Sequence, residues 1–278
     1  MNNTFNIKRF GLTFRKDMIE NLKRYLLLFL TLLGLITLLM VQQTWAHFQR
    51  SVDNVSLNKQ LLIFLSLMFS AAGIWFASTF TTPLNSKLKR LSYLISPASN
   101  LEKYLTRWII TTMGFIIAFF TAFWIADALK VTICSAIYPE VEIKFLDLTK
   151  LISSDHGWVG NTFVFPKSVF TFFVSLYFLL QSIFLLGSTY WEKASFIKTF
   201  TAGAAIITAY ILICRWTILL FYDNLDGFAN VMGSFEINRT ISEVQAINVA
   251  TIVLSVFTLT FWILAYFRMK ESEIIKRF

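Results

Sequence analysis

The sequence predicts an all-α, polytopic integral membrane protein with six transmembrane helices. The first observation is six long apolar stretches, each of about 20 residues or more, the length that a helix needs to cross the hydrocarbon core of a bilayer. The second is that these stretches are apolar on all sides, whereas helices of soluble proteins keep a polar stripe. The third is that basic residues gather on alternate sides of the stretches.

The composition agrees with this fold class, with 56% hydrophobic residues and 30 phenylalanines among 278 residues. No segment between the apolar stretches is long enough for a separate globular domain, so we expect one membrane domain over residues 1–278. The first stretch is too long for a typical secretory signal and should remain as an uncleaved anchor. The predicted spans are approximately residues 25–46, 61–80, 108–129, 168–190, 199–222 and 246–267.

Positive charge follows the membrane topology. Of the 25 Lys and Arg residues, 17 lie in residues 1–24, 81–107, 191–198 and 268–278, and seven lie in the alternate segments 47–60, 130–167 and 223–245. Because the more basic side of a membrane protein faces the cytoplasm, both termini are predicted to be cytoplasmic. The net charge of +9 therefore indicates contact with the lipid bilayer and its anionic headgroups rather than with nucleic acid.

The N-terminal tail, residues 1–24, has its own helical period. Apolar side chains recur every three or four residues and are flanked by cations, a pattern typical of an amphipathic helix that lies in the membrane interface. A basic tail without regular structure is the alternative reading. The predicted apolar face consists of Ile7, Phe10, Phe14, Met18 and Leu22.

The connection 81–107, expected in the cytoplasm, is the most patterned polar segment. A first helical face of leucines ends before Pro97, which lacks an amide proton and disfavours helix in the residue before it. Ser99 or Asn100 can cap a second helix with Glu102 in its first turn, and this helix should continue into the third span. On the expected outer side, 130–167 is the largest loop, with a possible strand at 141–145, and residues 228–235 of another loop have near-helical spacing.

Motifs for intrinsic chemistry are missing from the sequence. There is no phosphate-binding loop for nucleotide hydrolysis, and His47 and His156 are isolated on separate predicted loops. We therefore expect no catalytic residue, metal site or cofactor in this chain, and an intramembrane enzyme is disfavoured.

Two formal charges lie within the predicted spans, Asp127 and Arg215. Charges in the hydrocarbon are costly and mark functional positions. The two side chains are a candidate intramembrane pair that ties the third and fifth spans together. Alternatively, Arg215 lines a polar translocation path, or it extends to the interface on its own while Asp127 lies at the water boundary.

Three features resemble the membrane-spanning permease subunit of bacterial ABC-2-type transporters. They are the opening segment 5–10 leading to 21–25 before the first span, the Pro–small–Ser…Glu-Lys element within 95–105, and six spans with both ends inside. The motif-level resemblance covers about 45 residues. The long outer loop follows span three here, whereas such permeases elaborate the connection between spans five and six.

The resemblance implies an N-terminal elbow helix on the inner leaflet and a 81–107 coupling element that contacts a separate cytoplasmic ATPase. It implies a homo- or heterodimer in the bacterial cytoplasmic membrane, acting as an exporter whose partner hydrolyses ATP. A headgroup-binding loop remains the alternative for 81–107, and a sensor, assembly factor or scaffold the alternative function. The candidate ATPase contacts are Leu84, Lys87, Leu88, Arg90, Leu91, Glu102 and Lys103.

Overall fold

Six helices in the described part of the chain are long and apolar enough to cross a membrane, which confirms the predicted number of spans. The computed structural model describes residues 5–49, 54–82, 95, 97–139, 143–146, 152–153, 165–191, 193–222 and 243–275. The six helical units are α1 (Ile7–Gln49), α2 (Asn54–Ser78), a continuous run from Asn100 to Ile137, α6 (Lys167–Tyr190), α7 (Ser195–Tyr222) and α9 (Glu243–Ile275).

The third unit, Asn100–Ile137, has three parts. An α-helix, α4 (Asn100–Ile109), passes through a π-helical segment, η2 (Ile110–Gly114), into α5 (Phe115–Ile137). The described residues also contain two very short strands, β1 (Ile152–Ser153) and β2 (Phe165–Pro166), which pair in parallel. The strand expected at 141–145 is not seen at 143–146, while 141–142 and the expected helical turn at 228–235 lie outside the described residues.

Large apolar side chains cover the exterior of the spans. Ile206, Trp216 and Ile252 are each more than 60% exposed, and they belong to a set distributed over all six helical units. Soluble proteins rarely expose contiguous apolar surface on this scale, because such surface is unfavourable in water. The chain is therefore a multi-pass integral membrane protein, with lipid as the solvent for these faces.

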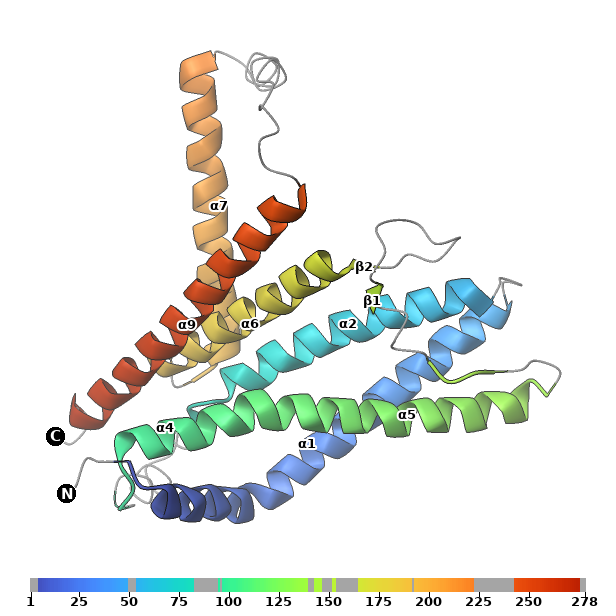
Figure 1. Cartoon of the computed structure of the whole chain (residues 1–278), viewed down its shortest axis with the longest axis horizontal. Helices are drawn as coiled ribbons and strands as arrows, with labels where there is room; N and C mark the ends of the chain where they lie inside the picture. Colours follow the sequence, from blue (N-terminus) through green and yellow to red (C-terminus); the bar gives the residue numbers. More distant parts are fainter. Residues whose placement is uncertain are drawn as a thin grey trace.

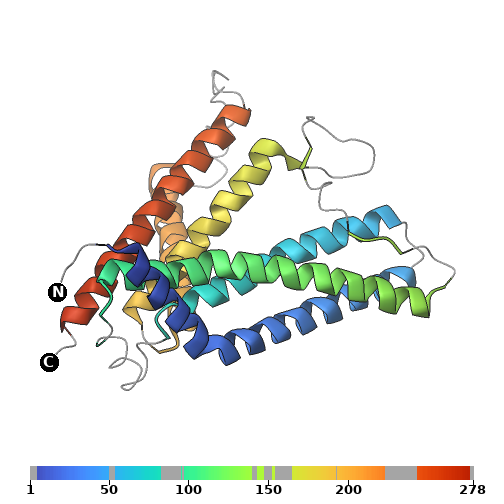
Figure 2. The same ribbon diagram turned by 60° about the horizontal axis from the view of Figure 1, so that its bottom comes forward.

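The helices converge at one end and diverge at the other (Figures 1 and 2). Helices α1 and α5 pack together, α6 packs along α9, and α2 contacts both pairs through α6 and α5. Helix α7 leaves this group at a steep angle and contacts mainly α6. The N-terminal end of α1, the start of α4 and the C-terminal end of α9 all lie at the convergent end of the molecule.

Two clusters of buried apolar side chains form the core. One lies among α1, α2 and α5 and is dominated by Phe119 and Phe123. The other lies at the convergent end, where Phe80 and Tyr104 meet Leu185 of α6. The second cluster fixes the position of α4, whose polar side contacts the N-terminal part of α1.

Helix α1 is longer than any single membrane crossing. Its 43 residues correspond to about 64 Å at 1.5 Å per residue, roughly twice the thickness of the hydrocarbon core. The N-terminal portion bends away from the direction of the span (Figure 2). The tail and the first span are thus one continuous bent helix, rather than an interfacial helix separated from the span by a break.

Candidate functional site

The start of α4 is fixed by a complete capping box. The hydroxyl oxygen of Ser99 accepts a hydrogen bond from the backbone N–H of Glu102, and the Glu102 carboxylate accepts one from the backbone N–H of Ser99. Helix starts leave backbone N–H groups without partners, and this reciprocal arrangement satisfies two of them. The predicted cap at Ser99 is confirmed, and it orients the Glu102 side chain towards α1.

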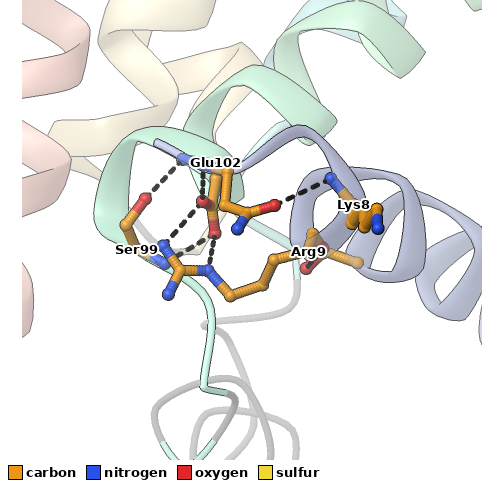
Figure 3. Close-up of polar contacts among 6 residues, drawn as sticks. Lys8, Arg9, Ser99 and Glu102 are labelled. Carbon is orange, nitrogen blue, oxygen red and sulfur yellow. Dashed lines mark hydrogen bonds and ion pairs between the residues drawn. The ribbon is translucent and has the colours of Figure 1, made fainter. Parts of the chain in front are cut away.

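Glu102 is the centre of the contact between α4 and the N-terminal part of α1 (Figure 3). Its carboxylate oxygens accept hydrogen bonds from Nε and Nη2 of Arg9, both at 2.8 Å, and from the backbone N–H of Asn6 at 2.8 Å. The Glu102 side chain is completely buried, whereas that of Arg9 is 28% exposed. A two-pronged Arg–carboxylate contact of this kind fixes orientation as well as charge.

These donors stabilise the ionised form of Glu102. Hydrogen bonding by Arg9, followed by the amides of Asn6 and Ser99, lowers the pKa of the Glu102 carboxyl from 4.5 to about 2, although burial acts in the opposite direction. The helical run that begins at Asn100 is about 57 Å long, nearly twice a hydrocarbon core of about 30 Å. Glu102, Lys103 and Arg107 all precede the apolar stretch that starts at Trp108, which places the first turn of the run outside the core. Glu102 therefore stays ionised at neutral pH and holds α4 to α1.

A second ion pair, two turns further along α1, holds the same two helices. The Asp17 carboxylate forms an ion pair with Nη2 of Arg107 at 2.7 Å, and both side chains are largely buried. Asp17 also accepts hydrogen bonds from Tyr25 and Asn21 on its own helix. Because Arg9–Glu102 and Asp17–Arg107 are separated along both helices, together they oppose both rotation and translation of α4 relative to α1. We call this pair of contacts the α1–α4 corner.

The α1–α4 corner changes the interpretation of two predicted ATPase contacts. Glu102 is fully buried and Lys103 is only 4% exposed, so in this structure neither offers its side chain to a partner protein. The Glu102 carboxylate is instead paired with Arg9 inside the chain. The other predicted contacts, Leu84, Lys87, Leu88, Arg90 and Leu91, lie outside the described residues.

Immediately after α4, the third span contains a polar contact inside the bundle. The amide nitrogen Nε2 of Gln181 in α6 donates to the hydroxyl oxygen of Thr112 at 2.9 Å, and both side chains are fully buried. Thr112 lies in the π-helical segment, a distortion that often occurs at functional positions. The contact is a hydrogen bond between two spans, from α6 to the third span.

The structure does not bring Asp127 to Arg215. The Asp127 carboxylate lies 2.5 Å from Nζ of Lys130, one turn along α5, and also accepts the backbone N–H of Leu146. Arg215 is exposed on the diverging helix α7, and the described residues show no ion pair between it and Asp127. The third span extends to Ile137, so Lys130, assigned from the sequence to the outer loop, is instead a fully buried residue of the helix.

Several of these residues were not singled out by the sequence. Arg9 and Asp17 look like ordinary charges in a basic tail, and their partners Glu102 and Arg107 lie about 90 residues away. One local signal was present, since Arg9, Asp17 and Asn21 share a helical face with Thr13 and Arg24. A stripe of mixed charges facing away from lipid favours contact with another protein segment.

Comparison with known proteins gives no matching family model, no matching curated protein and no matching solved structure. The class of the protein is therefore defined by its own geometry. It is a multi-pass membrane protein with six apolar helices, and at one end of the molecule two ion pairs join the first of these helices to the third.

Proposed function

We propose that this chain is the permease-like subunit of an ABC-type exporter, working with a separate cytoplasmic ATP-binding subunit on a substrate that remains to be identified. In this proposal both termini and the α1–α4 corner face the cytoplasm of a bacterial cell. The ATPase supplies the energy, and the membrane chain, alone or as a homo- or heterodimer, supplies the path.

The observation that supports this proposal most directly is the α1–α4 corner. A transporter driven by a separate ATPase needs a firm mechanical link between its extramembrane connection and its spans. Here the segment that follows the second span enters the third span through α4, and two ion pairs fasten α4 to the helix that forms the first span. A displacement of the connection would therefore move two spans together.

Within the 81–107 connection, residues 99–107 carry buried contacts with the rest of the chain. We therefore propose that the ATPase contact is made by residues 84–91. Replacing the whole of 84–105 would damage the fold as well as any partner contact. Charge reversal at Lys87 and Arg90 is the more specific change.

The test is co-purification of the tagged full-length chain from its native host. We expect a protein with a phosphate-binding loop to co-purify, and ATP hydrolysis to rise when both are placed in proteoliposomes. The double variant Lys87→Glu with Arg90→Glu should lose both properties, whereas Lys167→Glu, an exposed lysine at the opposite end of the spans, should keep them. Capture of other membrane proteins without any ATPase would favour a sensor, assembly factor or scaffold and would reject the proposal.

A further inference from the structure

The N-terminal part of α1 divides its polar residues between two faces. One face contacts the protein, and it holds the partly buried residues of the α1–α4 corner together with Arg24, which donates to Thr82. The opposite face is exposed and carries a second set of residues at spacings of four and three, which places them on one stripe. This outward stripe consists of Lys8, Leu12, Arg15 and Ile19, continued by Leu22 and Lys23, which follow Ile19 by three and four residues.

The outward stripe differs from the apolar face expected from the sequence. Of the expected face, Phe10 and Phe14 are partly buried, whereas Ile7 and Leu22 are 74% and 54% exposed, and Leu22 belongs to both surfaces. On the outward stripe, Leu12 and Ile19 are 67% and 63% exposed. The helix has turned so that its mixed-charge face makes the ion pairs of the corner. Aliphatic side chains and cations consequently alternate along the surface that remains free.

The cations of the stripe are not used within the described part of the protein. Neighbouring Lys16 pairs with Glu20, but Lys8, Arg15 and Lys23 form no ion pair among the described residues. Three positive charges therefore lie within about four helical turns without a carboxylate to neutralise them. Such a row attracts an anionic surface, and each cation near a charged leaflet contributes about a fivefold preference.

The stripe is continuous with the surface that faces the hydrocarbon. The same helix continues through Leu26, Leu27 and Leu30, all more than half exposed, into the first span. The outward stripe thus lies at the level directly beyond the hydrocarbon, where lipid headgroups are found. At that level leucines and isoleucines insert among the acyl chains while Lys and Arg extend to phosphates.

We propose that the outward stripe is a binding site for anionic phospholipid, in which Lys8, Arg15 and Lys23 bind headgroup phosphates and the intervening aliphatic side chains contact the acyl chains. Lipid bound there stabilises the bent portion of α1 and, through the ion pairs, the α1–α4 corner. Lipid binding at this stripe does not depend on whether the chain transports anything.

The experiment uses delipidated full-length protein in detergent, titrated with phosphatidylglycerol or with phosphatidylcholine, with thermal unfolding and native mass spectrometry as readouts. We expect phosphatidylglycerol to raise the unfolding temperature and to stay bound, and phosphatidylcholine to do neither. In the variant Lys8→Gln, Arg15→Gln, Lys23→Gln the titration midpoint should rise at least fivefold. The matched control Lys193→Gln, Lys198→Gln, Lys270→Gln removes three other exposed cations and should behave as wild type.

Three results would overturn the proposal. The first is equal stabilisation by the two lipids. The second is an unchanged phosphatidylglycerol midpoint in the outward-stripe variant, or an equal loss in the control variant. The third is full stabilisation by soluble glycerol phosphate at matched concentration, which would show that the cations bind a free anion rather than a lipid.

Discussion

Gly187 in α6 is the position where adding a single methyl group should have the clearest effect. A Cβ atom at this residue would overlap the side chain of Thr199 in α7, with Thr199 Cγ2 at 2.6 Å and Thr199 Cβ at 2.9 Å, and the Thr199 hydroxyl closer still. Thr199 is β-branched and buried, so rotation about χ1 cannot remove every overlap. The Gly187→Ala variant must therefore push α7 away from α6.

The expected loss follows from two opposing effects. Overpacking of a buried contact costs about 1–3 kcal/mol, and the upper part of that range applies because Thr199 Cβ itself is in the way. The higher helix propensity of alanine relative to glycine offsets about 1 kcal/mol of this loss in stability. We expect Gly187→Ala to lower the free energy of unfolding by about 2 kcal/mol. Gly203→Ala is the control, because a Cβ there meets nothing within 4 Å.

A double-mutant cycle with Thr199→Ala tests the cause. The Thr199 hydroxyl oxygen is buried and has no hydrogen-bond partner within the described protein, so its removal forfeits no hydrogen bond and the single variant should lose only about 1 kcal/mol. Removing Oγ1 and Cγ2 also makes room for the new methyl group at residue 187. The double variant should therefore be about as stable as Thr199→Ala alone.

The assay is reversible unfolding by sodium dodecyl sulfate in mixed micelles, followed by circular dichroism. A strongly non-additive cycle supports the close approach of α6 and α7 at Gly187. If Gly187→Ala proves as mild as Gly203→Ala, or if its loss simply adds to that of Thr199→Ala, the reasoning about this contact is wrong.

Three further predictions concern charge and backbone conformation. Because the pKa of Glu102 is lowered from 4.5 to about 2, its ionisation contributes about 3 kcal/mol to the free energy of unfolding. This contribution is complete above pH 4.5 and is lost as pH falls towards 2. Unfolding temperatures measured over this pH range should decline, and Glu102→Gln should remove the decline. Lys130→Met leaves the Asp127 carboxylate buried without its cation, so the free energy of unfolding should fall by about 3–5 kcal/mol. Expression level and unfolding in micelles would report this loss, and an unchanged protein would show that the pair is not buried. Ala194 has a φ of 54°, so Ala194→Gly should stabilise the turn before α7 by about 0.5–1 kcal/mol, and a lower unfolding temperature would contradict this.

The spans could be predicted from the sequence because membrane crossing depends on local composition. A run of about 20 apolar residues has few alternatives, since every backbone polar group in the hydrocarbon must be satisfied within the helix. The cap at Ser99 was also predictable, because its partner Glu102 is three residues away. These features require no knowledge of what lies elsewhere in the chain.

Pairings between distant residues could not be predicted in the same way. The hydrophobic period of the N-terminal tail indicated a helix correctly, but the ion pair of Arg9 with Glu102 determines which face turns outward. Likewise, the third span was predicted to end at residue 129, but the helix continues to Ile137, with Lys130 buried inside it and paired with Asp127. In both cases a charged side chain is used inside the protein, and only its three-dimensional neighbours reveal that use.

The π-helical segment Ile110–Gly114 has a consequence for how the third span tolerates changes in length. A π-turn accommodates one residue more than an α-turn, so deleting one residue here converts the segment to regular α-helix and leaves the flanking faces in register. The same deletion elsewhere in the span rotates everything beyond it by about 100°. The third span can therefore lose one residue within this segment, which contacts Gln181, and the two halves of the span would keep their relative rotation.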